Sequence, residues 1–206
     1  NGTVTVLDSG ITITCGSIEN NGYLQNSGTL TFTGNLDVTN DATFTRDFTN
    51  EGTIKVSKNA TFSDMFTNKG NLSVIGDGTF SYEVNNSGTI SISNNANFDA
   101  SLINSGTITC GSGDFTVTGT TSATGTISAG GDITFGGNAD VAGVTSQSGV
   151  ISFTGDATAS GAISADGDIT FGGNADVAGV TSTSGAISCD GDATASGAIS
   201  ANGNIT

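Results

Sequence analysis

The sequence predicts an all-β fold, a single-chain triangular parallel β-solenoid (β-helix) with about 18 residues per coil in three hexads. Three observations predict it. From Gly131 to Thr206 a glycine returns at every sixth place, with apolar or small side chains at the third and fifth places of each hexad. In the first half, Asn-x-Gly returns once in every three hexads from Asn50 to Asn104. The 206 residues include 32 glycines and no proline, and proline would remove a hydrogen-bond donor from a strand paired on both sides.

Each hexad predicts one short strand followed by a corner. The pleat of a strand sends alternate side chains to opposite faces, so places three and five point inward and the other places point outward. Glycine at the first place supplies the backbone freedom of a tight corner. One coil reads Gly52-Thr-Ile-Lys-Val-Ser, Lys58-Asn-Ala-Thr-Phe-Ser and Asp64-Met-Phe-Thr-Asn-Lys. Units this small bury an apolar face only by stacking on their neighbours.

The handedness of the coil stays open at this point. The left-handed hexapeptide helix prefers a small residue two places before a large aliphatic one, whereas here the third place is often large. This difference favours a right-handed coil.

The repeats divide the rod into two continuous sections. Residues 1–112 have Asn-x-Gly corners and a core rich in phenylalanine, and residues 113–206 have the glycine hexads. Residues 130–165 match residues 166–201 closely at an offset of two coils. Alanine takes many inward places of the second section, so we expect the rod to be thicker and better anchored at its N-terminal end.

Four asparagines are candidates for a structural site. Asn50, Asn68, Asn86 and Asn104 each occupy an inward fifth place just before a corner. Residues one coil apart lie above one another, so stacked amides could pass hydrogen bonds along the rod and satisfy corner carbonyls. We interpret these residues as a structural asparagine ladder, with a ligand-binding role as the alternative.

Three irregularities interrupt the repeat. The interval from Asn26 to Asn50 is four hexads instead of three, which predicts one extra hexad near Gly34, as an extruded loop or an enlarged coil. One residue is inserted around Gly111-Ser112, and the frame slips near Cys15. We interpret the last two as bulges at corners.

The charge of the chain limits its partners. Formal net charge is −15, from 19 acidic residues and four basic ones, Arg46, Lys55, Lys58 and Lys69. Nucleic acids and anionic membranes attract the opposite balance, so no nucleic-acid partner is expected. No apolar run is long enough to insert into a membrane as a helix.

Catalytic and redox chemistry find little support in the sequence. There is no histidine and one arginine, and no nucleophile lies beside a base, so we expect neither an enzyme nor a cofactor. Cys15, Cys110 and Cys189 have no metal-ligand spacing. Cys110 and Cys189 fall at inward places, and we expect both side chains to be buried and to pack as small hydrophobic residues. A disulfide between these two would have to cross several coils, which its geometry forbids.

Outward acidic residues also fall into columns. One column is Asn138, Asp156, Asn174 and Asp192, and another is Asp114, Asp132, Val150, Asp168 and Ala186. Like charges stacked at strand spacing repel, so we interpret the columns as solvation of the rod. The alternative is calcium held by Asp166 with Asp168, or by Asp190 with Asp192, because calcium takes oxygen ligands; no calcium repeat motif is present, and no metal is expected.

An ice-binding face would need a flat and regular threonine array. Thr29 with Thr31 and Thr107 with Thr109 suggest one, but Lys55 and Asn71 interrupt it in the coils between. The sequence therefore does not favour ice binding on that face.

The repeats resemble those of several fibrous proteins. The phrases over 34–44 and 131–143 resemble repeats of phage tail fibres and other virion-attached fibres, and Asn-Ser-Gly-Thr-Ile at 86–90 and 104–108 resembles bacterial surface adhesins and autotransporter passengers. The triangular, proline-free design is similar to bactofilins, from which the chain departs in its richness in threonine and asparagine and its few charged residues. The resemblance covers nearly the whole chain. It implies a structural or adhesive role outside the cytoplasm and points to no site residue.

The expected function is therefore structural. Neither end of the sequence shows a capping helix or a proline, and uncapped sheet edges pair with other chains. We expect a non-enzymatic fibre or filament subunit, extracellular, at the cell surface or attached to a virion, whose partners are copies of itself stacked head to tail. The alternative is a tail-fibre or adhesin shaft that presents loops, near Gly34 or Gly111, to a receptor or glycan.

Overall fold

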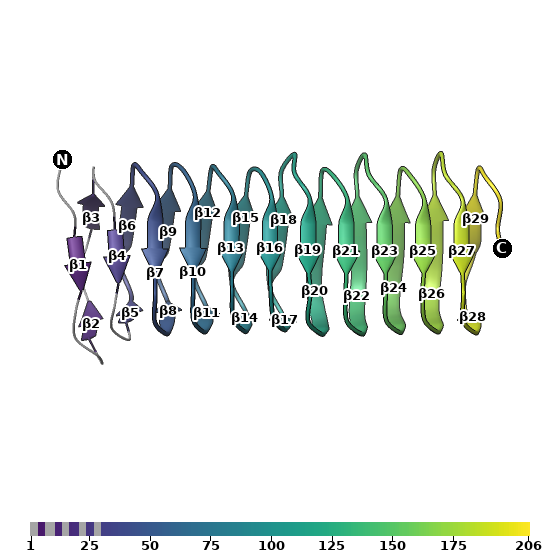
Figure 1. Cartoon of the computed structure of the whole chain (residues 1–206), viewed down its shortest axis with the longest axis horizontal. Helices are drawn as coiled ribbons and strands as arrows, with labels where there is room; N and C mark the ends of the chain where they lie inside the picture. Colours follow the sequence, from purple (N-terminus) through teal and green to yellow (C-terminus); the bar gives the residue numbers. More distant parts are fainter. Residues whose placement is uncertain (1–3, 7–10, 14–16, 21–23, 27–29) are drawn as a thin grey trace.

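The computed structural model describes residues 4–6, 11–13, 17–20, 24–26 and 30–206, and all regular structure in these residues is β-strand. The strands wind into a parallel β-solenoid of about 10 turns, with about 18 residues per turn (Figure 1). The fold class expected from the hexads is therefore confirmed. Each coil of the first section has three sides, which we call the first, second and third sides in chain order.

The first side is an 11-stranded parallel sheet along the whole rod. Every strand has three residues, the middle side chain points outward from β7 to β27, and neighbours pair in register one coil apart (for example Thr61 with Thr43). Its strands are β1 (Val4–Val6), β4 (Leu24–Asn26), β7 (Ala42–Phe44), β10 (Ala60–Phe62), β13 (Gly78–Phe80), β16 (Ala96–Phe98), β19 (Phe115–Val117), β21 (Ile133–Phe135), β23 (Ile151–Phe153), β25 (Ile169–Phe171) and β27 (Ile187–Cys189).

The other two sides are separate strands in the first section. The second side contains β2 (Ile11–Ile13), β5 (Leu30–Phe32), β8 (Phe48–Asn50), β11 (Phe66–Asn68), β14 (Val84–Asn86) and β17 (Leu102–Asn104). The third side contains β3 (Ser17–Asn20), β6 (Asn35–Val38), β9 (Thr53–Val56), β12 (Asn71–Val74), β15 (Thr89–Ile92) and β18 (Thr107–Cys110).

In the second section a single long strand forms both the second and the third side of each coil except the last. Gly125, Gly143, Gly161 and Gly179 lie in the middle of these strands, where the first section has its Asn-x-Gly corner. The last coil again has two short strands. These strands are β20 (Thr121–Ala129), β22 (Ala139–Ser146), β24 (Ala157–Ala165), β26 (Ala175–Ser182), β28 (Ala193–Ala195) and β29 (Ile199–Ala201).

The core is a narrow column filled by the inward places. Behind the first side, Phe62, Phe80 and Phe98 stack with ring centroids 5.0 and 4.6 Å apart and ring planes within 4°. The second section keeps phenylalanine on its first side, whereas Ala139, Ala157 and Ala175 fill its second side. The core thus changes composition along the rod without interruption.

The prediction that places three and five point inward is wrong for two hexads. In those beginning at Gly143 and Gly179, the buried side chains lie at places two and four: Val144 and Ser146, then Val180 and Ser182. Between β22 and β24 the pairing shifts by one residue, from Ala139 with Ala157 to Val144 with Ile163. A one-residue shift in the opposite direction occurs between β20 and β22 and between β24 and β26, so successive coils alternate and the true repeat is two coils.

The irregularities have different outcomes. The inserted residue is confirmed, because Ala96 pairs with Phe115, one place farther along the chain than the regular period, across a corner that contains Gly111 and Ser112. The extra hexad is wrong: Asn26 pairs with Phe44 on the first side, one regular period on, and belongs to a different column from Asn50. No loop is extruded at Gly34, which lies in a short corner between β5 and β6. Cys15 lies outside the described residues.

Candidate functional site

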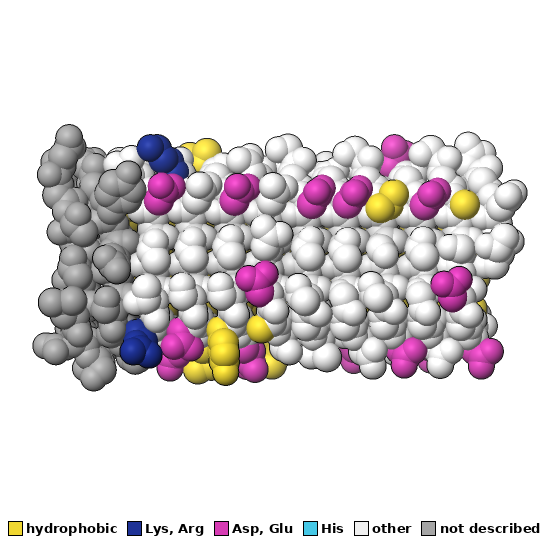
Figure 2. Space-filling model, in the orientation of Figure 1, with side chains coloured by type: hydrophobic (Ala, Val, Ile, Leu, Met, Phe, Trp, Pro, Cys, Tyr) yellow, Lys and Arg dark blue, Asp and Glu magenta, His cyan; other side chains and the backbone are white. Residues whose placement is uncertain are grey.

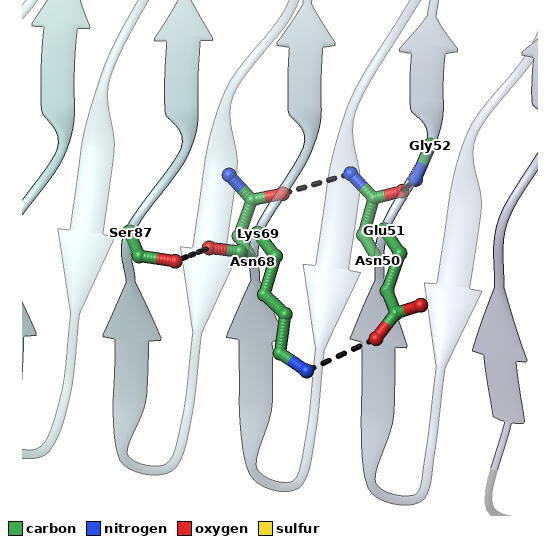
Figure 3. Close-up of polar contacts among 6 residues, drawn as sticks. All are labelled: Asn50, Glu51, Gly52, Asn68, Lys69 and Ser87. Atoms are coloured by element: carbon green, nitrogen blue, oxygen red, sulfur yellow. Dashed lines mark hydrogen bonds and ion pairs between the residues drawn. The ribbon is translucent and has the colours of Figure 1, made fainter.

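The four candidate asparagines form a continuous column at the corner between the second and third sides. Each side chain is at most 2% exposed. The Nδ2 of Asn50 donates to Oδ1 of Asn68 at 2.8 Å, Asn68 donates to Asn86 at 2.8 Å, and Asn86 donates to Asn104 at 2.7 Å. Figure 3 shows the first of these amide–amide contacts between neighbouring coils. All three bonds run in one direction, toward the C-terminal end.

The same amides hold the corner backbone. The Nδ2 of Asn68 also donates to the carbonyl of Gly70 at 3.1 Å and to that of Thr89, in the next coil, at 3.0 Å. A buried carbonyl without a hydrogen-bond partner costs free energy. Each asparagine therefore stabilises the corner of its own coil and the corner of the next coil. Glycine follows two places later because a Cβ on Gly70 would lie 2.0 Å from the carbonyl oxygen of Gly52.

The column closes at both ends without an unpaired amide. Below Asn50 the same place holds Phe32, and the Asn50 Oδ1 accepts the N–H of Gly52 at 3.1 Å instead. Above Asn104 it holds Ala123, and the Asn104 Nδ2 donates to the carbonyls of its own and the next corner. Polar groups are buried here at little cost because they are hydrogen-bonded.

Outside this column, Lys69 and Glu51 form an ion pair at 3.0 Å (Figure 3). Both side chains are largely in solvent, with 55% and 41% of their surface exposed. Exposed pairs contribute about 0–1 kcal/mol. The pair therefore adds little to the stability that the buried amides provide.

The outward acidic columns make hydrogen bonds that sequence reasoning missed. In each, Oδ1 of an Asp or Asn accepts the backbone N–H of the residue above it, as from Asp132 to Asp114 at 2.9 Å and from Asn174 to Asp156 at 2.9 Å. The column that contains Asp114 begins earlier than expected, at Asp41, and continues through Asn59, Asp77 and Asn95 to Asp114. The recurrence of Asp or Asn at the same place in most coils, interrupted at Val150 and Ala186, was the available signal.

The carboxylates suggested for calcium are partly engaged in these columns. Asp168 accepts the N–H of Ala186 at 2.8 Å. An open groove of about 340 Å³ is lined by Asp156, Asp176 and Asp192 together with threonine and alanine. Among the described residues, no three Asp, Glu, His or Cys side chains lie close enough together to hold a metal ion.

Two of the cysteines lie in the described part of the chain, and both are free thiols. Cys110 is buried, as expected, and its Sγ donates to the carbonyl of Asp114. Burial raises the pKa of Cys110 to about 11. Cys189 is only half-buried because it lies in the last coil.

The last coil exposes the cross-section of the rod. Val177 and Val180 are buried one coil earlier, whereas Ile199, which pairs with Val180, is 40% exposed. An apolar hollow of about 80 Å³ opens there, lined by Val177, Val180, Ile187, Cys189, Ile199 and Ile205, among others. In this coil β28 and β29 are paired on one edge within the described chain, whereas the outer edge of β27 is paired with residues 204–206, as in the N–H of Ile187 donating to the carbonyl of Asn204 at 2.9 Å.

Comparison with protein-family models, with curated protein sequences and with solved structures found no match. No helix in the described residues is long and apolar enough to cross a membrane. The function must therefore be argued from the rod itself.

Proposed function

We propose that this chain is a structural, non-enzymatic subunit of an extracellular fibre or filament, in which copies stack head to tail through open β-sheet edges. The observation that carries the proposal is the stacking of similar coils through parallel, in-register strand pairs, which is the same contact that would join one copy to another. In the last described coil, Ile199 and Cys189 are partly open to solvent.

Two interactions would drive the stacking. The backbone N–H and C=O groups on the outer edge of β28 and β29, and of residues 204–206 where they cover β27, can pair with strands of another copy, as neighbouring coils pair within the chain. Ile199 and Ile205 are 40% and 56% exposed, so covering either one contributes roughly half of the ~1.5–3 kcal/mol for burying a fully exposed isoleucine. Both interactions continue the geometry that already joins each coil to the next.

The location outside the cytoplasm is supported by the resemblance of the repeats to those of fibres and surface adhesins. A second candidate function, a shaft that binds a receptor or glycan, is favoured by exposed apolar side chains on the first section, of which Tyr82 (59%) is the most suited to stacking on a sugar. Hydrophobic side chains are visible at the lower rim of the rod in Figure 2.

Negative-stain microscopy of the purified chain over a range of concentrations tests the assembly. We expect filaments whose length grows with concentration. Ile199→Lys places a charge in the contact and should leave short rods, whereas Ile103→Lys, at a similarly exposed isoleucine on β17 away from the edge, should still form filaments. Discrete rods of the unmodified chain at every concentration, or equal effects of both variants, would refute head-to-tail stacking.

A further inference from the structure

The first side of the rod carries an unbroken row of short polar side chains, which we call the hydroxyl rank. It consists of the outward middle residue of each strand from β7 to β27, and every member is half-buried. All but one carry a hydroxyl group. The members are Thr43, Thr61, Thr79, Asn97, Thr116, Thr134, Ser152, Thr170 and Ser188.

The rank is regular because strand pairing sets its spacing. Each member lies directly opposite the next in the parallel register, so successive hydroxyls repeat at the strand spacing of about 4.8 Å. The register on this side has no shift from Ile133 to Cys189, unlike that of the long strands. The insertion at Gly111-Ser112 falls in a corner and leaves Asn97 opposite Thr116.

The rank is also rigid. Threonine is stiff at χ1 because its Cβ is branched. Behind the sheet, the stacked rings of Phe62 and Phe80 fix the strands from inside. Along one border, the acidic column that starts at Asp41 is held by hydrogen bonds to the next coil, such as the N–H of Asn59 on Asp41 at 3.0 Å. Figure 2 shows rows of uncharged side chains along the rod, bordered by a row of acidic ones.

A flat and repeating surface fits a flat and repeating partner. A small ligand needs a concave pocket with convergent groups, whereas many weak contacts spaced along a rod add up only when the partner has the same period. Each threonine hydroxyl both donates and accepts hydrogen bonds, and its methyl group is apolar. The oxygen atoms on faces of an ice crystal repeat at close to the strand spacing. Each of them needs both a hydrogen-bond donor and a hydrogen-bond acceptor as partners. We propose that the hydroxyl rank on the first side is an ice-binding face.

Other crystalline partners fit the rank less well. A mineral surface is ionic, and the rank itself contains no charged side chain. Crystalline polysaccharides are gripped by exposed aromatic rings, and the phenylalanines of the first-side strands are buried. Lys55, which interrupts the threonine array suggested by the sequence, lies on the third side and not in the rank. This proposal does not depend on filament assembly.

Thermal hysteresis and uptake of the labelled chain into a growing ice crystal test the proposal, at concentrations where the chain is not assembled. The rank variant is Thr61→Lys with Thr134→Lys. Its control is Thr67→Lys with Thr158→Lys, which changes the equivalent outward places of the second side. We expect hysteresis and ice uptake in the unmodified chain and the control, and loss of most of both in the rank variant.

Circular dichroism must show that each variant keeps its fold. Thr61→Gln with Thr134→Gln is the uncharged second variant, and it should lose ice uptake as well. Absence of hysteresis in the unmodified chain overturns the proposal, as does a folded rank variant with full activity or an equal loss in the control. Binding to cellulose or calcite without uptake into ice would also overturn it and would assign the rank to another crystal surface.

Discussion

The asparagine ladder makes a quantitative prediction at Asn68, the second of its four members. Asn68→Leu replaces a buried amide by an apolar side chain of somewhat larger volume. The Oδ1 of Asn86 then loses the N–H that it accepts from Asn68, and the Nδ2 of Asn50 loses its acceptor there while keeping the carbonyl of Asn71 at 3.1 Å. The substitution thus leaves one amide oxygen unpaired in the core and one donor with a partner missing, and it removes the amide donor from the carbonyls of Gly70 and Thr89, as Asn104→Leu does at its own corners.

The expected cost follows from these two groups. An unpaired buried polar group costs about 1–3 kcal/mol. The leucine recovers about 1.5–3 kcal/mol if it is fully buried, but the tight stack opposes its extra volume at a cost of about 1–3 kcal/mol. We expect a net loss of about 2–4 kcal/mol in the free energy of unfolding.

Urea unfolding followed by circular dichroism measures the loss, with Asn104→Leu as the matched control. Asn104 is the last member, so its replacement leaves no asparagine above it unpaired, and Asn86 keeps its bonds to the carbonyls of Gly88 and Thr107. The control should lose roughly half as much free energy. An Asn68→Leu chain as stable as the unmodified one, or equal losses in both variants, would refute the relay of amide hydrogen bonds as the source of stability.

Three further predictions concern the backbone and the thiol. Gly52→Ala should prevent normal folding, because its Cβ would lie 1.9 Å from a carbonyl oxygen of the coil below, whereas Gly143→Ala, whose nearest contact is 3.2 Å, should fold with a similar melting temperature. Asp132→Ala removes an acceptor of a backbone N–H and should cost about 0.5–1.5 kcal/mol in urea unfolding, more than Asp140→Ala on another side. The raised pKa of Cys110, from 9.0 to about 11, contributes stability that is complete below pH 9 and is lost as pH rises through 11; the free energy of unfolding should fall by about 2–3 kcal/mol over this range, and less in Cys110→Ala.

The fold could be predicted because apolar residues recur in the sequence at the third and fifth places of the hexads, which are the inward places of the coil. At Ile54 and Val56, or at Ala60 and Phe62, the third and fifth places of a hexad are buried as expected. A strand buries one face, and a shift of one residue would bury the wrong set. The pattern of apolar residues therefore fixes the inward phase wherever it is strict.

The hexad does not say which side of the coil it forms, and this explains the error at Asn26. Asn26 and Asn50 both lie two places before a glycine, but four hexads separate them, which is one coil and one side. Equivalent places on different sides look alike in one dimension. The pairing of neighbouring coils, which is a contact between residues distant in sequence, is what distinguishes them.

The hydrogen bonds of the two kinds of column differ in how far sequence could anticipate them. The asparagine amides at inward places have few partners other than each other, so their pairing follows from burial. The outward Asp and Asn side chains could equally have been solvated by water, and only the backbone geometry above each one shows that Oδ1 reaches an N–H. Repulsion between stacked carboxylates, which suggested solvation, is reduced where Asn alternates with Asp.

The two sections form the corner between the second and third sides in different ways. The asparagine column ends where the first form is replaced by the second. In the first section the chain breaks the strand at each corner, and a buried amide pairs the freed carbonyls. From Thr121 onward the strand continues through the corner, where a glycine lies, and its pairing is interrupted at Thr124 and Gly125 and resumes at Thr126. The change from asparagine to alanine at Ala123 coincides with this change in backbone, and the long strands adjust their register at the corner by the alternating one-residue shift.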